Sequence, residues 1–307
     1  MSSARVGTFR LVPQRRFVGV GVGEHRSPRR GAGDEVAGTR PYRPGDRRTW
    51  IDWRASARLS AARGTDEFVV REFFADTAPR AVVAIDRRPR MALHGSAFPW
   101  LDKAATIDHA VGLIGRSVTA ERGDLALVAD RGGRPVWVAP RAPRTVLDQL
   151  QPADRDTYAA GPRSFDGCLR LLVQHASAFP AGTFVFALSD FVEAVSPRMW
   201  RRLRALHWDV TPVVVQDPTW EQSFPDVGGV LLPVGDVVTG EVRDVWIRRG
   251  EARDRAAANE QRLDALLRMF RHLGFDPIVL GSSDPGEIAR CFGRWAERRM
   301  RLRRRSA

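Results

Sequence analysis

The residue types that most often perform enzymatic chemistry are present in this sequence, but they lack the spacing that such chemistry requires. The six histidines include no pair at the HxxxH or HExxH spacing of a helical zinc site. No GxSxG nucleophile motif, phosphate-binding P-loop or CxxC motif occurs. Asp124 and Asp130 flank one expected strand, and nothing marks them as a catalytic pair. We therefore expect a protein that is not an enzyme.

The densest group of polar and aromatic residues lies near the N-terminus. It comprises Arg40, Tyr42, Asp46, Asp52 and Trp53. Because Trp, Tyr and Arg dominate the energetically important positions of protein interfaces, this group could form a docking surface. It could instead form an internal network that locks an N-terminal arm onto the rest of the protein, with Arg40 or Arg58 bridging one of the acids. We favour the internal network, because so dense a motif usually serves the fold.

The chain is strongly basic. Its 307 residues include 49 Lys and Arg against 36 Asp and Glu, which gives a formal net charge of +13. The last expected helix ends in a run of arginines at residues 298–305. Such a charge could bind nucleic acid by releasing counter-ions from its phosphates, but no helix-turn-helix, zinc module or basic stripe with interleaved aromatic residues is evident. Binding of nucleic acid or of an anionic surface is therefore the alternative function.

Cysteine content and hydropathy indicate the cellular compartment. Cys168 and Cys291 cannot form a disulfide framework and show no metal-ligand spacing, which is typical of a reducing compartment. No run approaches the roughly 18–20 apolar residues of a membrane span, and the first residues lack the apolar stretch of a secretory signal. We expect a cytoplasmic protein without a transmembrane segment, which could still touch a membrane surface.

The hydrophobic pattern divides the chain at about residue 78. Residues 1–78 are rich in Arg, Gly and Pro, and they contain two stretches of strand-like composition, at 17–22 and 67–74. A Pro-Gly-Asp turn signal lies between them at residues 44–46. This part is expected to form a β-rich N-terminal arm or module.

Residues 79–307 alternate between strand and helix patterns. Continuous apolar runs at 80–86 and 183–188 are typical of strands buried on both faces of a sheet. The first run ends in Asp86, and Ser189 and Asp190 follow the second. The other expected strands are residues 124–129, 134–139, 210–216 and 275–280, and the expected helices are residues 101–121, 164–178, 196–207, 253–273 and the last segment from about 284. Strands that alternate with helices imply a mostly parallel sheet covered on both faces.

One motif of the N-terminal module is long enough to identify. It reads Gly31-Ala-Gly33-Asp-Glu35-Val, then Arg40-Pro-Tyr42-Arg-Pro44-Gly45-Asp46, then Ile51-Asp52-Trp53-Arg-Ala-Ser56-Ala57-Arg58. This pattern resembles the signature of a bacterial family named only as domain of unknown function 58. Val36, Arg47 and Thr49 depart from the family pattern, which leaves Asp46 and Asp52 as the acids of the motif. A match over about thirty residues is far more specific than a single Gly-rich loop.

The resemblance implies a fold and a function. Family members carry a domain like the von Willebrand factor type A domain, so residues 79–307 are expected to form a von Willebrand factor A-like α/β domain ending in a basic helix. Members are usually not known as enzymes, and their genes commonly neighbour those of MoxR-type AAA+ ATPases. The resemblance thus implies an adaptor or protein–protein interaction protein that works without a cofactor, with such an ATPase, in assembling or activating protein complexes.

A type A domain normally holds Mg²⁺ at a metal-ion-dependent adhesion site with the motif Asp-x-Ser-x-Ser. The resemblance places Asp86 at the first Asp, Arg88 and Arg90 at the two Ser positions, Asp190 at a distant Asp and Ser164 nearest to a Thr position. An arginine has no usable lone pair for a cation, and one guanidinium at 4 Å would repel Mg²⁺ by about 8 kcal/mol at an effective dielectric constant of about 20. We therefore expect a degenerate site that binds no metal.

Three interpretations of this degenerate site stay open. The loop could have drifted and carry no function. Arg88 or Arg90 could occupy the place of the metal and form an ion pair with Asp86 and Asp190. The same arginine could instead point outward and receive the carboxylate of a protein partner, because arginine binds carboxylates through two parallel hydrogen bonds.

Overall fold

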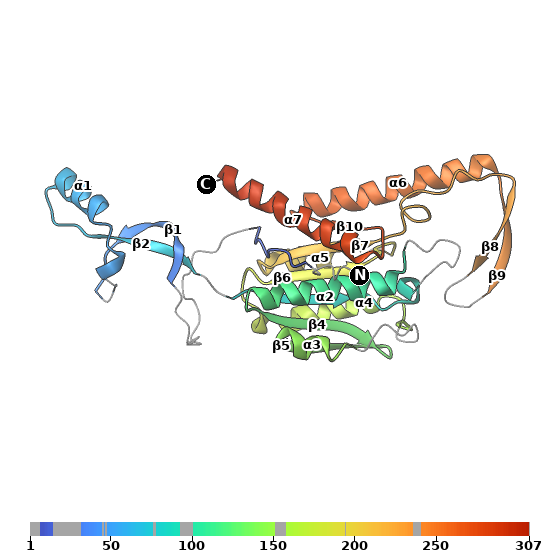
Figure 1. The fold of residues 1–307 in the computed structure, drawn as a ribbon, viewed down its shortest axis with the longest axis horizontal. Helices are drawn as coiled ribbons and strands as arrows, with labels where there is room; N and C mark the ends of the chain where they lie inside the picture. Colours follow the sequence, from blue (N-terminus) through green and yellow to red (C-terminus); the bar gives the residue numbers. More distant parts are fainter. Residues whose placement is uncertain are drawn as a thin grey trace, which may run out of the picture. The chain divides into compact units, whose positions relative to one another are not determined.

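The computed structural model describes residues 7–14, 32–44, 46, 48–75, 78–92, 101–150, 158–193, 195–235 and 241–306. The chain divides into two compact units (Figure 1). The small unit is Arg15–Ala78, and the large unit combines Met1–Gln14 with Pro79–Ala307. The N-terminal module was expected to include all of residues 1–78, whereas the segment Met1–Gln14 belongs to the large unit.

The small unit contains two antiparallel strands and a helix. Strand β1 (Ala32–Pro41) pairs with β2 (Val69–Ala75). Between them in the sequence come the 3-10 turn η1 (Arg48–Trp50) and helix α1 (Trp53–Arg63). The strand expected at 67–74 is thus present two residues later, the strand expected at 17–22 lies outside the described residues, and the helix was not expected.

Helix α1 begins and ends at residues whose types favour helix ends. Asp52 precedes the helix, and its carboxylate accepts a hydrogen bond from the backbone N–H of Ala55 at 3.1 Å. Gly64 follows the helix with a φ of 67°, a left-handed conformation that glycine adopts without strain. An Asp before and a Gly after an alanine-containing run are the local signals that could have predicted this helix.

A six-stranded sheet forms the centre of the large unit. Its order is β10-β7-β6-β3-β4-β5, and every neighbouring pair is parallel except β4 and β5. The strands are β3 (Arg80–Ile85), β4 (Asp124–Arg131), β5 (Arg134–Arg141), β6 (Phe184–Ser189), β7 (Asp209–Val215) and β10 (Ile278–Leu280). The first of these strands lies inside the sheet and the chain winds outward on both sides of it, as in doubly wound folds.

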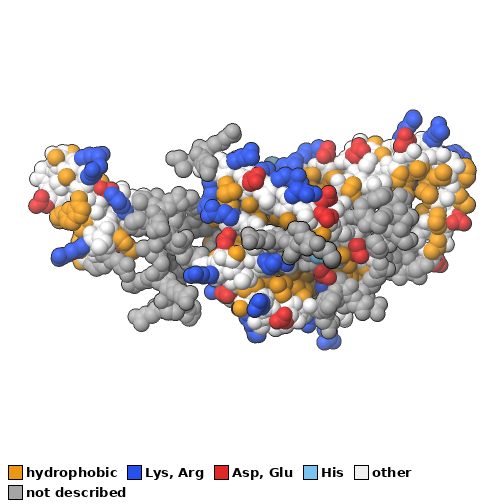
Figure 2. Space-filling view, in the orientation of Figure 1, with side chains coloured by type: hydrophobic (Ala, Val, Ile, Leu, Met, Phe, Trp, Pro, Cys, Tyr) orange, Lys and Arg blue, Asp and Glu red, His pale blue; other side chains and the backbone are white. Residues whose placement is uncertain are grey.

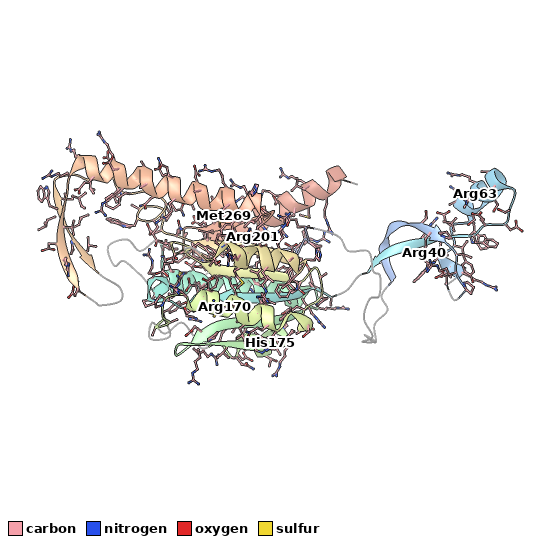
Figure 3. All side chains as sticks on the ribbon, turned by 180° about the vertical axis from the view of Figure 1, so that it is seen from behind. Arg40, Arg63, Arg170, His175, Arg201 and Met269 are labelled. Atoms are coloured by element: carbon pink, nitrogen blue, oxygen red, sulfur yellow. The ribbon has the colours of Figure 1, made fainter. Side chains whose placement is uncertain are left out.

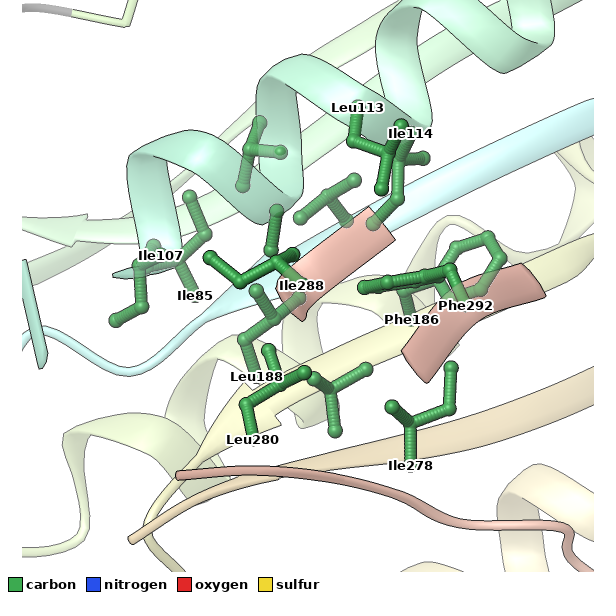
Figure 4. Close-up of a cluster of buried hydrophobic side chains, with 14 of the residues drawn as sticks. Ile85, Ile107, Leu113, Ile114, Phe186, Leu188, Ile278, Leu280, Ile288 and Phe292 are labelled. Carbon is green, nitrogen blue, oxygen red and sulfur yellow. The ribbon is translucent and has the colours of Figure 1, made fainter. Parts of the chain in front are cut away.

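Helices cover both faces of this sheet. One face carries α2 (Lys103–Ala120), α3 (Pro143–Leu147) and α7 (Pro285–Ser306), and the other carries α4 (Ser164–Gln174), α5 (Pro197–Ala205) and α6 (Arg249–His272). Alternate side chains of β3 serve the two faces: Val83 and Ile85 join the first cluster, and Val82 and Ala84 join the second. Figure 4 shows the first cluster, in which side chains of α2 and α7 meet the sheet. The expected α/β architecture, a mostly parallel sheet covered by helices on both faces, is confirmed.

The N-terminal segment of residues 7–14 completes the first hydrophobic cluster. Phe9, Leu11 and Val12 are buried there. The ring of Phe9 lies 4.9 Å from that of Phe292 and 5.7 Å from that of Trp295, both on α7. Burial of these apolar side chains explains why the segment belongs to the large unit, despite its distance in sequence from the rest of that unit.

The remaining elements are short turns and a separate hairpin. The 3-10 turns η2 (Pro89–Ala92) and η4 (Ala176–Ala178) follow β3 and α4. Strands β8 (Val230–Gly235) and β9 (Val242–Ile247) pair with each other as a two-stranded antiparallel sheet. Leu231 and Trp246, which are paired across this hairpin, are both exposed. In the part of the chain that is described, no helix combines the length and apolar character needed to cross a bilayer.

Candidate functional site

Asp86 and Asp190 lie at the same edge of the central sheet. Asp86 directly follows β3 and Asp190 directly follows β6. These two strands are parallel neighbours, and Ile85 pairs with Leu188. Both strands therefore end at the same level of the sheet. The backbone N–H of Asp86 donates to the Leu188 carbonyl at 3.0 Å. Both carboxylates are buried, so each needs a charged or hydrogen-bonding partner.

Arg88 covers Asp86. Its Nε lies 2.9 Å from Asp86 Oδ1 and its Nη2 lies 2.6 Å from Oδ2, which is the two-pronged geometry of a strong arginine–carboxylate pair. Ser189 Oγ donates to the same Oδ2 at 2.6 Å, and the Glu193 carboxylate pairs with Nη1 of Arg88. Burial disfavours the charged guanidinium, but hydrogen bonding and attraction to Asp86 outweigh burial and raise the pKa of Arg88 above its ordinary value. The arginine is therefore a fixed positive charge.

Asp190 lies between two other cations. Its Oδ2 is 3.3 Å from Arg90 Nε and 3.2 Å from Lys103 Nζ. Glu221 contacts the same two cations, at 2.6 Å from Lys103 Nζ and 3.5 Å from Arg90 Nη2. Burial would raise the pKa of Asp190, but attraction to Lys103, then to Arg90, outweighs burial and holds that pKa below its ordinary value. Asp190 therefore stays ionised inside the protein.

Lys103 is the central cation of this second group. It is the only lysine of the chain and the first residue of α2, directly after the N-cap residue Asp102. A cation at a helix N-terminus opposes the helix dipole, and burying an ammonium group costs free energy unless acids surround it. Contacts with Asp190 and Glu221 offset both costs. Lys103 was not expected at this site, although a lone lysine among arginines is a visible signal.

The seven charged groups form what we call the edge network. Its members are the cations Arg88, Arg90 and Lys103 and the carboxylates Asp86, Asp190, Glu193 and Glu221. The residues present do not fit a divalent cation, because ammonium and guanidinium groups already occupy the carboxylate oxygens. Among the described residues, no group of three or more His, Cys, Asp or Glu could hold a metal ion.

One of the three interpretations of this site was that Arg88 or Arg90 forms an ion pair with Asp86 and Asp190. The edge network contains ion pairs of this kind. Arg88 pairs with Asp86, and Arg90 pairs with Asp190, so the two arginines divide the two acids between them. Capture of a partner's carboxylate by Arg88 would require Glu193 to leave, because Glu193 already pairs with its Nη1. Glu193 is half exposed, so it is the one carboxylate of the network that a competitor could reach easily.

Three other polar side chains, those of Arg87, Tyr158 and Ser164, are not members of the edge network. The guanidinium of Arg87 lies 4.6 Å from the centre of the Tyr158 ring, a cation–π contact. Burial raises the pKa of Tyr158 above its ordinary value, so the phenol stays neutral. Ser164, the nearest candidate for the Thr position of a metal site, has a buried Oγ that makes no hydrogen bond to any described residue. Ser164 therefore does not act with Asp86.

The acids of the N-terminal motif have structural roles within the small unit. Arg40 binds Asp46 through two hydrogen bonds of 2.7 and 2.6 Å. That pairing, with a backbone hydrogen bond from Arg43, lowers the pKa of Asp46 to about 2. Asp52 caps α1 and also accepts a hydrogen bond from Arg71 Nε at 3.0 Å, which is the main reason that its pKa is lowered.

Arg40 was one of the two arginines expected to bridge an acid of the motif, and it pairs with Asp46. Arg71, on β2, binds Asp52, whereas Arg58 forms no ion pair with any described residue. Pro44 lies in the turn that lets the Asp46 carboxylate reach the backbone N–H of Arg43 at 2.8 Å. Gly45 lies outside the described residues. These contacts favour an internal network within the small unit for the acids of the motif.

The aromatic residues of the motif behave differently from its acids. The rings of Trp53 and Phe68 lie 6.0 Å apart, and that of Tyr42 lies 6.5 Å from Phe68. Trp53 is 62% exposed and Phe68 is 46% exposed. We call Tyr42, Trp53 and Phe68 the aromatic patch. Figure 2 shows hydrophobic side chains gathered at the surface of the small unit.

Comparison with protein families assigns the chain. Residues 38–265 match the family described as "Protein of unknown function DUF58". The chain belongs to the DUF58 family. The matched region starts within β1 and ends in α6, so it includes the aromatic patch and the edge network of this DUF58 protein.

Solved structures similar to this DUF58 protein are distant. The conserved hypothetical protein BatB from Bacteroides thetaiotaomicron has a TM-score of 0.38 and 12% identity, over 64% of this chain and 98% of that one. An aerotolerance-related membrane protein from Bacteroides fragilis NCTC 9343 has a TM-score of 0.36 and 9% identity, over 63% and 99%. The pilus adhesin SpaC from Lactobacillus rhamnosus GG has a TM-score of 0.37 and 13% identity, over 73% and 30%. Comparison of the DUF58 chain with curated proteins gave no match.

Proposed function

We propose that this DUF58 protein is an adaptor that acts by binding other proteins and catalyses no reaction. The aromatic patch carries the proposal. Trp and Tyr are enriched at the positions that dominate interface energies, and Trp53 projects from α1 with most of its surface exposed. Internal ion pairs occupy the acids of the same motif, so the aromatic side chains are the part of the motif that is available to a partner.

The chemistry of the edge network supports a role without catalysis. A general base needs a carboxylate that can gain and lose a proton near neutral pH. Asp190 is instead held ionised by Lys103 and Arg90, and a two-pronged pair with Arg88 occupies Asp86. Burial raises the pKa of Cys168 to about 12, which makes its thiol a poor nucleophile at neutral pH.

The proposed partner is a MoxR-type AAA+ ATPase. This choice rests on the resemblance of the N-terminal motif to the DUF58 family alone, which is an argument by analogy. We place this protein and the ATPase in the cytoplasm, where both cysteines would stay reduced and where ATP is available. In this proposal the ATPase binds the aromatic patch, and the large unit provides a surface for the protein complex to be assembled.

The test is binding of the purified full-length chain to the MoxR-type ATPase of the same organism, measured by calorimetry. Trp53→Ala is expected to weaken binding about tenfold or more, as for a central interface tryptophan. Trp246→Ala on the β8–β9 hairpin is the matched control, because Trp246 is similarly exposed, at 56%. Unchanged binding in Trp53→Ala, or equal weakening in Trp246→Ala, would contradict the proposal.

Binding of nucleic acid is the alternative proposal, and the contacts of the C-terminal arginines weigh against it. Arg299 is buried against Asp209, with Nη1 2.8 Å from Oδ2, and Arg298 pairs with Asp276. Burial of Arg299 removes it as a phosphate contact, and Arg298, which is half exposed, would have to leave Asp276 to bind a phosphate through the same nitrogen. An electrophoretic shift at 50 mM salt that disappears at 200 mM would indicate electrostatic binding to phosphates. No shift at either salt concentration would contradict this alternative.

A further inference from the structure

A hollow between α4 and α5 lies on the face of the large unit opposite to α2. Its volume is about 150 Å³, roughly the space of five water molecules in the liquid. The lining residues are Asp166, Arg170, Ser196, Arg198, Met199 and Arg202. Figure 3 shows this face of the large unit, with Arg170 of α4 and Arg201 of α5 labelled. Nothing in the edge network or the aromatic patch uses this hollow.

The hollow gathers positive charge that has no internal partner. Arg198 and Arg202 are four residues apart on α5, so they project on the same side of that helix. Arg170 comes from α4. None of these three arginines forms an ion pair or a hydrogen bond with another described residue, whereas exposed arginines elsewhere, such as Arg268 and Arg290, pair with acids of their own helices. Helix α5 itself contains no acid.

Two further groups of the hollow can recognise a ligand. Asp166 Oδ1 is buried and has no hydrogen-bond donor among the described residues. The Asp166 side chain lines the hollow, so its carboxylate can accept a hydrogen bond from a ligand there. Ser196 precedes α5, and its side chain makes no capping hydrogen bond, so its hydroxyl is available. The hollow therefore offers cationic donors together with one strong acceptor.

We propose that this hollow binds inorganic phosphate. Three arginines and one aspartate give the lining a charge of +2, which hydrogen phosphate balances as a dianion. The planar forks of arginine match the oxygens of a phosphate group. Hydrogen phosphate also carries one P–OH, which can donate to the carboxylate of Asp166, one of the lining residues. Sulfate has the same shape and charge but no such proton, and a phosphomonoester dianion lacks it too.

The test is calorimetry on the full chain at pH 7.5 and constant ionic strength, with inorganic phosphate, sulfate and phosphoserine as separate ligands. Phosphate is expected to bind at one site, with sulfate and phosphoserine about tenfold or more weaker, the loss expected for one charge-assisted hydrogen bond. Arg198→Ala and Arg202→Ala are each expected to weaken phosphate about tenfold. Arg201→Ala is the matched control, because Arg201 lies on the same helix and does not line the hollow.

Asp166→Asn tests the role of the carboxylate separately. An amide can donate a hydrogen bond to sulfate, so the preference for phosphate over sulfate is expected to disappear while the anion still binds. Equal affinity for phosphate and sulfate in the natural protein would overturn the proposal. Weakening by Arg201→Ala as large as that by Arg202→Ala would also overturn it, because it would show attraction to the general positive charge. Thermal unfolding of each variant checks that it is folded.

Discussion

The ammonium group of Lys103 lies 2.6 Å from Glu221 and 3.2 Å from Asp190. A lysine from the start of α2 thus neutralises acids from two other connections of the large unit, beside Arg88 and Arg90. An ammonium group carries a single charge and moves with its side chain, whereas a bound Mg²⁺ would carry two charges and could exchange. The edge network is therefore a permanent part of the fold.

Removing the ammonium group should destabilise the large unit. Lys103→Met keeps the length of the side chain but leaves Asp190 and Glu221 with Arg90 as their remaining cation. We expect a loss of about 3 kcal/mol in the free energy of unfolding, as for other broken buried ion pairs. A urea titration followed by circular dichroism measures it.

The control for Lys103→Met is Arg268→Met. Arg268 pairs with Asp264 on the exposed surface of α6, 3.7 Å apart, and exposed pairs of this kind contribute less than about 1 kcal/mol. Equal losses in the free energy of unfolding for the two variants would contradict the prediction. They would show that the buried contacts of Lys103 contribute no more stability than an exposed ion pair.

Divalent metal should have no effect on the protein. The carboxylate oxygens of Asp86 are held by Arg88 and Ser189, and Arg90 and Lys103 contact Asp190. We expect calorimetry with Mg²⁺ or Mn²⁺ to show no binding, and we expect a chelator to leave the unfolding midpoint unchanged. Micromolar binding that vanishes in Asp86→Ala would contradict this expectation.

Acid should destabilise the large unit through Asp190. Because the pKa of Asp190 is lower in the folded protein than in the unfolded chain, its contribution to stability is complete above the unfolded value of about 3.9. That contribution is lost as the pH falls through the lower folded value. Asp190→Asn should therefore reduce stability at pH 7 and flatten its decline below about pH 4. The measurement is a series of urea titrations from pH 7 to pH 2.

The control for the acid series is Asp264→Asn, since Asp264 is exposed on α6. That variant should follow the curve of the natural protein at every pH. A decline in Asp190→Asn that is as steep as in the natural protein would assign the acid sensitivity to other carboxylates.

The N-terminal segment should stabilise the large unit through Phe9. This ring is buried against Phe292 and Trp295. Phe9→Ala should cost about 3–5 kcal/mol, the usual range for a buried phenylalanine. Thr8→Ala, at an exposed neighbouring position, should cost little. Equal stability of the two variants, measured by urea titration, would show that the segment does not belong to the core.

Local sequence patterns determined most of the large unit. Apolar runs such as the one that forms β3 predict strands buried on both faces, and β3 is such a strand. The pairing of Asp86 and Asp190 at a single site was an expectation from the family resemblance, and the structure has both acids at the same edge of the sheet. Helix α1 was not expected, although Asp52 and Gly64, the residue types that favour helix ends, flank it in the sequence.

Tertiary structure alone decided which charges meet. Glu221 lies 131 residues from Arg90 and 118 from Lys103, and Phe9 meets Phe292 from the far end of the chain. Hydrophobic periodicity shows which face of a segment is buried, and a few helical turns or one strand of sequence are enough to determine it. The partner of a buried charge depends instead on which loops converge at the sheet edge, and that follows only from the strand order and the packing of the helices.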